Sequence, residues 1–173
     1  MAPVNGQILY CLNLQAANKS FVYGVETGLW SEWRDTGTSR FNCVAAAYRD
    51  GITYLQDASS GQVYTISSNY YTDKASTYSV YVQTNKSSFG TSKRKVETAV
   101  SLIGDQTTGT VDVHVSDDDF KTSTYVGAID MSLERKRVTR LGSFYERSHL
   151  FEYRGTSSFR VQAYAPDIEP TRS

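Results

Sequence analysis

The chain has 173 residues, 39% of them hydrophobic, which suits one domain or two small ones with a core of ordinary size. Lys plus Arg and Asp plus Glu both number 18, so no net charge draws the whole chain to nucleic acid or an anionic membrane. No apolar run reaches the roughly 18 residues of a membrane span, and the start, Met-Ala-Pro-Val-Asn-Gly, lacks the regions of a signal peptide. We therefore expect a globular protein that is made in soluble form and not exported.

The first part of the chain alternates short strand-like runs with turn sequences. A hairpin is predicted around Glu26-Thr27-Gly28, because glycine takes the positive φ of a tight loop. Short strands at regular spacing with Gly turns are typical of an antiparallel meander, and the pattern around Gly51 and Gly61 is typical of a β-propeller blade. The stretch holds at most about one and a half blades, which cannot bury both their faces alone. The predicted strands are Gln7–Leu14, Phe21–Val25, Leu29–Trp33, Phe41–Tyr48, Ile52–Leu55 and Gln62–Ile66.

The second part of the chain contains its clearest strand, Val111–Ser116. Three valines alternate with Asp112, His114 and Ser116, which indicates a strand with one wet face, and three aspartates then favour a turn. No segment has a helical period over eleven residues, although Met131–Arg137 could form one helical turn. We expect a β-sandwich of about seven strands here. The other predicted strands are Tyr78–Val82, Lys95–Leu102, Thr124–Ile129, Arg137–Gly142, His149–Arg154 and Ser158–Tyr164.

The fold predicted from these patterns is all-β with little or no helix. Residues 1–75 are expected to form a propeller-blade-like meander, and residues 76–173 a β-sandwich domain. The two cysteines, Cys11 and Cys43, sit in apolar runs with no neighbouring Cys or His at metal-ligand spacing, so we expect buried free thiols.

Three motifs in the second part carry a resemblance to a known family. Val113–Asp119, Arg137–Gly142 and Arg147–Glu152 together resemble the C-terminal domain of the packaged-DNA stabilisation or tail hub proteins of short-tailed bacteriophages. Their pattern is a strand ending in Ser-Asp-Asp, an Arg-rich strand ending in Arg-Leu-Gly, and an Arg-containing strand ending in a Phe-rich run. Upstream, Thr27–Trp30 and Ser60–Tyr64, with Tyr71-Thr72-Asp73 after it, are similar to the last propeller strands of the same proteins.

The chain departs from this family at three points. Such proteins are much longer, with most of a propeller before this region. The family often has Gly at the position of Asp119, and a Trp after the turn where this chain has Lys121–Thr124. The resemblance implies a non-enzymatic structural role in the virion, in a hub, nozzle or adaptor ring that helps retain or channel packaged DNA. The implied partners are copies of the chain, other tail or connector proteins and DNA in the lumen, without a membrane, a metal or a cofactor, after assembly in the host cytoplasm.

The acidic residues and the histidines are candidates for catalytic or metal-binding sites. Asp117-Asp118-Asp119 could bind Ca²⁺, but the spacing lacks a central Gly and a distal Glu, and Lys121 stands where an oxygen is needed, so a solvated turn is favoured. Glycoside hydrolysis by this cluster with Glu97, Glu134 or Glu146 depends on a carboxylate separation that the sequence does not fix. His114 and Asp112 lack a nucleophile elbow, which favours a surface histidine. His149 is the second of the two histidines. No catalytic residue is therefore assigned.

Two basic stretches and a set of aromatic residues are the candidate contact sites. Clustered cations neutralise phosphates, and a ring of subunits would multiply a weak patch, although acidic residues are interspersed. Aromatic side chains suit interfaces, and they also support an alternative function as a carbohydrate- or receptor-binding β-sandwich of a phage tail. Trp30 and Trp33 differ by an odd number and should face opposite sides of their strand. The candidate DNA or subunit contacts are Lys86, Lys93, Arg94, Lys95, Arg135, Lys136, Arg137 and Arg140, and the candidate interface aromatics are Trp30, Trp33, Tyr70 and Tyr71.

Overall fold

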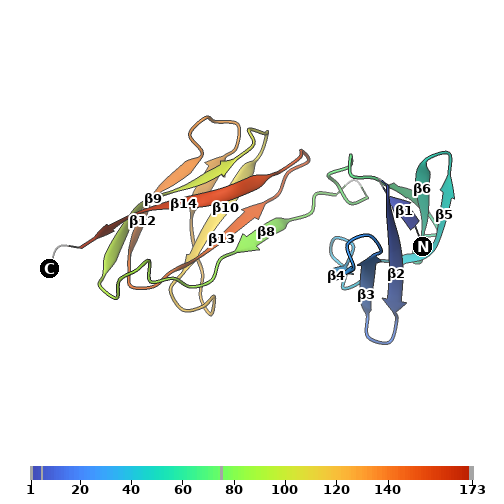
Figure 1. Cartoon of the computed structure of the whole chain (residues 1–173), viewed down its shortest axis with the longest axis horizontal. Coiled ribbons are helices and arrows are strands. Elements are labelled where there is room, and N and C mark those ends of the chain that lie inside the picture. Colours follow the sequence, from blue (N-terminus) through green and yellow to red (C-terminus); the bar gives the residue numbers. More distant parts are fainter. Residues whose placement is uncertain (1, 5, 75, 172–173) are drawn as a thin grey trace. The chain divides into compact units, whose positions relative to one another are not determined.

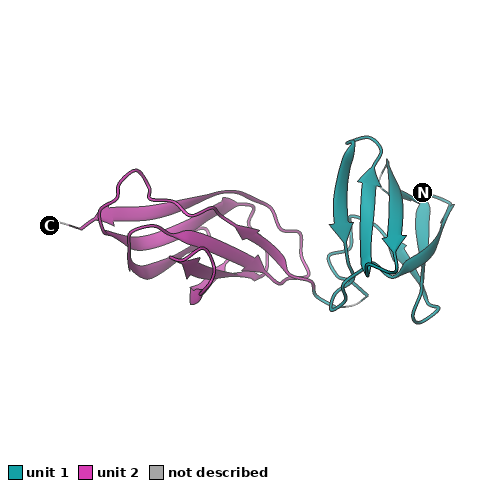
Figure 2. Cartoon of the chain, turned by 90° about the horizontal axis from the view of Figure 1, so that it is seen from below, with its two compact units in different colours: residues 1–77 teal, residues 78–173 magenta. Residues whose placement is uncertain are grey.

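The computed structural model describes residues 2–4, 6–74 and 76–171, and these form fourteen β-strands and no helix (Figure 1). The predicted all-β class is confirmed, and the segment Met131–Arg137 forms turns and bends before the next strand begins. The chain divides into two compact units, Met1–Thr77 (unit 1) and Tyr78–Ser173 (unit 2), coloured separately in Figure 2. The sequence placed the boundary after Ala75, which lies outside the described residues.

Unit 1 contains two antiparallel sheets with strands in sequence order. The described residues form no closed propeller. The short strand β1 is not among the predicted strands. It contains Pro3, which is tolerated there since β1 lies at the edge of its sheet. The first sheet consists of β1 (Ala2–Val4), β2 (Gln7–Leu14), β3 (Lys19–Gly24) and β4 (Leu29–Trp33), and the second of β5 (Cys43–Arg49), β6 (Ile52–Asp57) and β7 (Val63–Ile66).

Unit 2 contains two further antiparallel sheets, with strand orders β11-β10-β13-β8 and β12-β9-β14. Side chains from both sheets enclose one hydrophobic core, which includes Val100 of β9, Val113 of β10 and Phe151 of β13. The strands are β8 (Val80–Gln83), β9 (Lys95–Gly104), β10 (Thr110–Ser116), β11 (Thr124–Asp130), β12 (Arg137–Phe144), β13 (Ser148–Tyr153) and β14 (Val161–Pro170).

The predicted alternation of β10 is confirmed. Val111 and Val113 are fully buried and Val115 nearly so, whereas Asp112 and His114 lie on the opposite face and are partly exposed. This pattern follows from the period of two along a strand. β10 pairs with β11 on one side and β13 on the other, so it is an interior strand of its sheet. The strand that the sequence singled out is therefore the one around which unit 2 is packed.

A β-bulge in β9 changes which side chains reach the interior of unit 2. Between Glu97 and Ala99 the register of β9 shifts against both neighbouring strands. Across from it, β12 takes positive φ at Arg140 (66°) and at Gly142 (85°). In a regular strand Glu97 and Val100 would point to opposite faces, because side chains alternate. The bulge turns both of them inward, so a carboxylate enters the end of the core.

Candidate functional site

The most unusual chemistry in unit 2 is a network of ionisable side chains, which we call the interior ion network: the buried Glu97, Arg147 and His149, and Asp117, which is 48% exposed. Arg147 Nη1 donates to Glu97 Oε2 at 3.2 Å, and Arg147 Nε and Nη2 donate to the two oxygens of Asp117 at 2.8 and 3.1 Å. His149 Nε2 lies 2.8 Å from Glu97 Oε1. The side chains of Glu97 and His149 are fully buried, and that of Arg147 is 4% exposed.

The aromatic surroundings of this network complete its packing. The Arg147 guanidinium lies 4.4 Å from the centre of the Phe144 ring, and His149 stacks on Phe151 with ring centres 6.0 Å apart. With its proton on Nε2, His149 donates to Glu97, and Nδ1, which has no hydrogen-bond partner, carries a lone pair and not an unpaired N–H. A bare acceptor of this kind is the less costly arrangement in an apolar site.

The interior ion network links β9 to Arg147 and β13 and to the backbone of β12 by hydrogen bonds. Burial lowers the pKa of Arg147, but hydrogen bonds and charge from Asp117 and Glu97 outweigh this and raise it, so the guanidinium stays charged. Arg147 also donates to the carbonyl of Leu141, which ties β12 to β13. Glu97, considered above as a catalytic carboxylate, has no exposed surface through which a substrate could reach it. The surface position favoured for His114 agrees with its partly exposed place on β10. His149, for which the sequence favours no position, is buried on the inward face of β13 with Phe151.

Each aspartate of the turn after β10 has its own partner. Asp117 binds Arg147, and Asp119, which has a φ of 60°, binds Lys86 at 3.2 Å. Asp118 accepts from the backbone N–H and hydroxyl of Thr122 at 2.9 and 2.7 Å, and these hydrogen bonds lower the pKa of Asp118 to about 2. The three carboxylates are thus used separately to shape and anchor the turn. Among the described residues, no group of three or more His, Cys, Asp or Glu is placed to hold a metal ion.

The first basic stretch lies in and beside the loop from β8 to β9, and its charges have local partners. Lys86 pairs with Asp119 and, at 3.6 Å, with Glu146. Lys95 is 1% exposed, and its ammonium donates to the carbonyls of Thr91 and Lys93. Lys95 therefore cannot contact DNA in this conformation. The side chains of Lys93 and Arg94 are exposed, and Arg94 donates to the hydroxyl of Ser143 at 2.6 Å.

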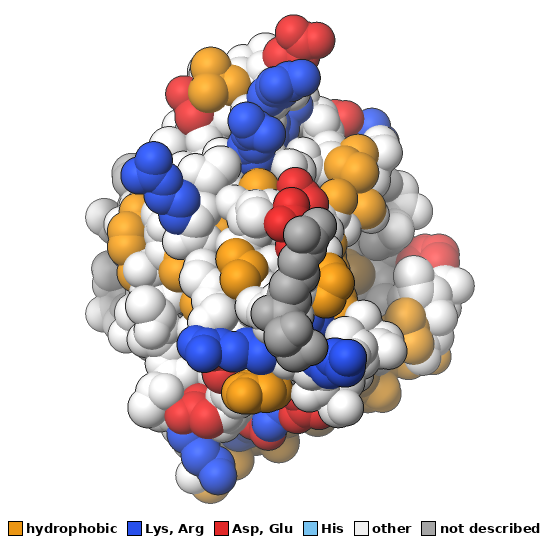
Figure 3. Space-filling model, turned by 90° about the vertical axis from the view of Figure 1, so that its left-hand side faces the viewer, with side chains coloured by type: hydrophobic (Ala, Val, Ile, Leu, Met, Phe, Trp, Pro, Cys, Tyr) orange, Lys and Arg blue, Asp and Glu red, His pale blue; other side chains and the backbone are white. Residues whose placement is uncertain are grey.

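The second basic stretch lies at the start of β12. Arg135, Arg137 and Arg140 are exposed and Lys136 is partly exposed. No ion pair involves these four side chains within the described part of the chain. Figure 3 shows a face on which Lys and Arg side chains are interspersed with Asp and Glu and do not merge into one basic surface.

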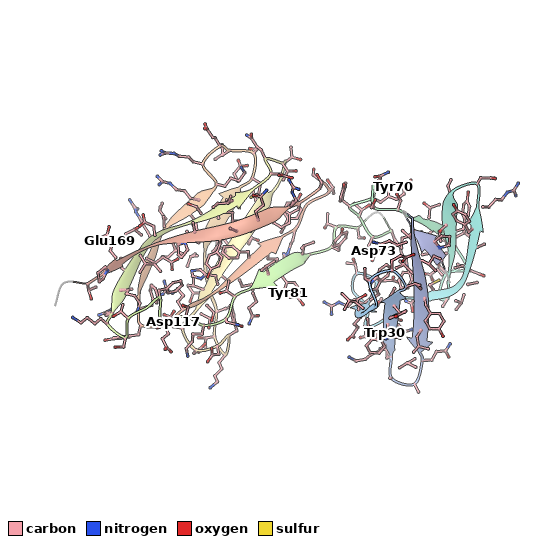
Figure 4. The ribbon with its side chains drawn as sticks, in the orientation of Figure 1. Trp30, Tyr70, Asp73, Tyr81, Asp117 and Glu169 are labelled. Carbon is pink, nitrogen blue, oxygen red and sulfur yellow. The ribbon has the colours of Figure 1, made fainter. Side chains whose placement is uncertain are left out.

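The candidate aromatics do not form one patch. Trp30 and Trp33 lie on opposite faces of β4, because their positions differ by an odd number. Trp30 is 54% exposed, whereas Trp33 packs edge-on against Phe41, with ring centres 5.8 Å apart. Tyr70 is 60% exposed in the segment after β7, apart from Trp30 in Figure 4, and Tyr71 beside it is partly buried.

The two sheets of unit 1 face each other across a small cavity of about 170 Å³. Leu9, Cys11 and Val22 line it from the first sheet, and Ala46 and Leu55 from the second. Both cysteines line this cavity as free, half-buried thiols, and burial raises the pKa of each. Because side chains alternate along a strand, residues one position away from these point away from the cavity on the outer side of each sheet.

The outer sides of both sheets of unit 1 carry apolar side chains. We call the outer side of the first sheet face A: Tyr10, Tyr23 and Trp30 are paired across β2, β3 and β4 and form a row in which the Tyr23 and Trp30 rings are 5.1 Å apart. We call the outer side of the second sheet face B. Face A also includes Ile8, Leu12 and Phe21. Face B includes Ala47, Ile52, Tyr54 and Val63, with the polar Arg49, Gln56 and Thr65 on the same side.

Unit 1 contains an ion pair network that the sequence does not indicate. The Lys74 ammonium lies 2.7 Å from Asp35 and also binds Asp57, and the two carboxylates are 5% and 3% exposed. Asp57 also accepts from the N–H groups of Ser59 and Ser60. Hydrogen bonds from Lys74 and Ser59 lower the pKa of Asp57. Burial lowers the pKa of Lys74, but the two aspartates outweigh this and raise it.

No protein-family model matches the chain, and no curated protein matches it. No helix in the described part of the chain could cross a membrane. The geometry of the two units is therefore what a function has to be argued from.

Proposed function

We propose that the chain is a structural component of a bacteriophage tail or head-to-tail connection, assembled as a ring that helps retain or channel packaged DNA. In this proposal unit 1 supplies propeller-blade-like sheets and unit 2 is a β-sandwich. The support from sequence is the resemblance of Val113–Asp119, Arg137–Gly142 and Arg147–Glu152 to the hub proteins of short-tailed phages. These three motifs cover the second half of β10 with its turn, most of β12 and most of β13, so they lie on the strands that build the interior of unit 2.

The observation that carries the proposal is that both sheets of unit 1 are apolar on both sides. Trp30 is 54% exposed on face A and Val63 is 63% exposed on face B. The edge strand β5 is exposed at every residue from Val44 to Arg49. An unpaired edge and exposed apolar faces are unfavourable for an isolated protein, and contact with further sheets removes both costs. Unit 1 has the features of a part that belongs in a larger β-assembly.

The basic residues at the start of β12 suit the proposed DNA lumen. Arg135, Lys136, Arg137 and Arg140 have no carboxylate partners among the described residues, and a ring repeats them once for each copy. If they line the lumen, changing Arg137 and Arg140 to Gln together should weaken retention of DNA in particles without changing ring formation.

The test is incorporation into a virion. Purified protein is studied by light scattering and electron microscopy, and virions from its source are probed with an antibody to the chain. The proposal predicts ring-shaped oligomers and labelling at the tail or its junction with the head. A monodisperse monomer at high concentration, together with unlabelled virions, would contradict it.

A second candidate function is carbohydrate or receptor binding by unit 2. One observation favours it: on the outer side of the sheet β11-β10-β13-β8, Asp112 pairs with Glu152, which pairs with Tyr81, and Tyr125 pairs with His114 in the next row. Tyr81 and Tyr125 are 58% and 55% exposed. Carboxylates beside exposed rings can bind sugar hydroxyls and the apolar side of a sugar ring. A glycan array should then give hits that Tyr81→Ala abolishes, and an array without hits removes this candidate.

A further inference from the structure

The two free cysteines of unit 1 lie on different sheets and line the same cavity. Cys11 belongs to β2 of the first sheet, and Cys43 is the first residue of β5 in the second sheet. Both line the cavity of about 170 Å³ between the sheets. We call these two residues the thiol pair. Because they are distant in the sequence, it is the packing of the two sheets that brings them to one cavity.

A single side chain connects the two members of the thiol pair. Cys11 Sγ donates to Asn13 Oδ1 at 3.7 Å, and Asn13 Nδ2 donates to the backbone carbonyl of Cys43. The two cysteines therefore contact the two ends of one amide group. Burial raises the pKa of Cys11 most, and the charge of Cys43 raises it further, which requires the two sulfur atoms to lie near each other.

The surroundings of the thiol pair keep it reduced until an oxidant is supplied. Burial raises the pKa of both thiols, so at neutral pH both are protonated and react slowly. Cys43 Sγ donates to the carbonyl of Ala45 at 3.3 Å, and neither thiol has a cation as a hydrogen-bond partner. Both residues are only partly buried, so a small disulfide reagent can reach them.

A covalent bond between the two sheets would act on the unit that encloses less apolar surface. In unit 1 the buried hydrophobic side chains are Val22 of the first sheet and Leu55 of the second. The hydrogen bonds between the sheets include those from Asn13 to Cys43 and from Thr53 to the carbonyl of Pro3. A bond from β2 to β5 restricts the unfolded chain and so favours the folded arrangement of these two sheets.

We infer that the thiol pair is a redox clamp: oxidation by a low-molecular-weight disulfide joins Cys11 to Cys43 and fixes the first sheet of unit 1 to the second. One thiol loses its proton, and its thiolate attacks a sulfur of oxidised glutathione, which gives a mixed disulfide and releases one glutathione. The second cysteine, also as a thiolate, then attacks the protein sulfur of that mixed disulfide and releases the other glutathione. The cysteines lose two electrons and two protons, and these reduce oxidised glutathione to two thiols.

The clamp concerns unit 1 alone and does not depend on the proposed function. Thiols stay reduced in cytoplasm and form disulfides in oxidising surroundings. If the chain is part of a phage particle, release of the particle from the host is the step that exposes the thiol pair to an oxidant. The same bond would form in any setting that supplies a small disulfide.

The experiment equilibrates the full-length chain with mixtures of reduced and oxidised glutathione, once folded and once in urea. Mass spectrometry after acid quenching separates chains with an internal bridge from chains that carry glutathione, and digestion without reductant locates the bridge. The equilibrium constant for the bridge should be at least about tenfold larger in the folded chain than in urea. By linkage, the bridge should lower the unfolding equilibrium constant of unit 1 by the same factor. Fluorescence of the two tryptophans, which both belong to β4 of unit 1, measures that factor.

Cys43→Ser is the matched control, because it keeps one thiol and cannot form the bridge. Its unfolding transition should not respond to oxidised glutathione. Three results would overturn the inference: a folded chain that takes up glutathione without joining Cys11 to Cys43, a bridge that is no more favourable in the folded chain than in urea, and disulfides that join two chains in dilute protein. Absence of the chain from virions would instead contradict the proposed function and leave the redox clamp unaffected.

Discussion

The two units of the chain are built from the same kind of strand but bury very different amounts of apolar surface. Of the fourteen buried hydrophobic side chains among the described residues, only Val22 and Leu55 belong to unit 1, and the other twelve belong to unit 2. Unit 2 turns two sheets toward one core, whereas each sheet of unit 1 has apolar side chains on both sides. The difference teaches that unit 2 encloses a core of its own, whereas unit 1 leaves apolar surface that our proposal covers with additional sheets.

Each unit contains one ion pair network, and the two networks differ in which of their side chains are exposed. In the interior ion network of unit 2 the central Glu97 and His149 are fully buried, and only Asp117 reaches the surface. In unit 1 the Lys74 side chain that joins Asp35 and Asp57 is 29% exposed. Both tryptophans of the chain are in unit 1, so tryptophan fluorescence follows that unit alone and circular dichroism follows both. The two units can therefore be perturbed and monitored separately.

The largest effect is expected from Arg147→Ala. The substitution leaves Glu97 buried without its cation and removes the partner of Asp117, which should lower the free energy of unfolding of unit 2 by about 3–5 kcal/mol. Urea unfolding followed by circular dichroism measures it, and the tryptophan transition should not move. The control is Arg154→Ala, since Arg154 is 61% exposed and its ion pair should contribute at most about 1 kcal/mol. Equal effects of the two changes would show that the network is not important for stability.

A smaller effect, confined to unit 1, is expected from Lys74→Met. Two nearly buried carboxylates, Asp35 and Asp57, lose their shared donor, which should cost about 2 kcal/mol. The tryptophan transition in urea should shift, while the transition of unit 2 stays in place. Lys19→Met removes an ion pair that is 50% and 44% exposed and should leave both transitions nearly unchanged. A shift in unit 2 would contradict the separation of the two units.

The smallest effect concerns acid stability. The pKa of Asp118 is lowered to about 2 by Thr122, so its carboxylate stabilises unit 2 above the unfolded pKa of about 3.9, and this contribution is lost as the pH falls toward 2. Asp118→Asn should make the unfolding midpoint of unit 2 less dependent on pH between about 4 and 2. Asp50→Asn, at a carboxylate that is 82% exposed in unit 1, is the control. An unchanged pH dependence in the Asp118 variant would mean that the hydrogen bonds from Thr122 do not form.

The strands could be predicted because their side chains alternate. The valines of β10 show the period of two directly, and the glycines at 28, 51 and 61 mark the turns of unit 1 with positive φ. The edge strand β14 was predicted to end at Tyr164 but continues to Pro170. Prolines stop most strands, but the missing N–H is tolerated at the edge of a sheet.

The interior ion network could not be predicted, because it depends on a bulge. The sequence predicts a strand from Lys95 to Leu102, with Lys95 as a candidate DNA or subunit contact and Glu97 as a candidate acid, and nothing local marks the register shift that turns both side chains inward. His149 was in principle visible, since it shares its side of β13 with Phe151 and Tyr153. His149 pairs with Glu97, which is 52 positions away in the sequence. Such a pairing is set by the packing of the sheets and not by local sequence.

Hydrogen–deuterium exchange of the full chain at low and high concentration tests the central claim, that the outer faces of unit 1 are covered by further copies, most directly. Amides of β4 and β5 should exchange quickly in dilute protein and several-fold more slowly as the concentration rises, because stacking of sheets suppresses local opening. Amides of β10 should be protected equally at both concentrations. Exchange in β4 and β5 that does not depend on concentration, while the protein stays folded, would contradict the account.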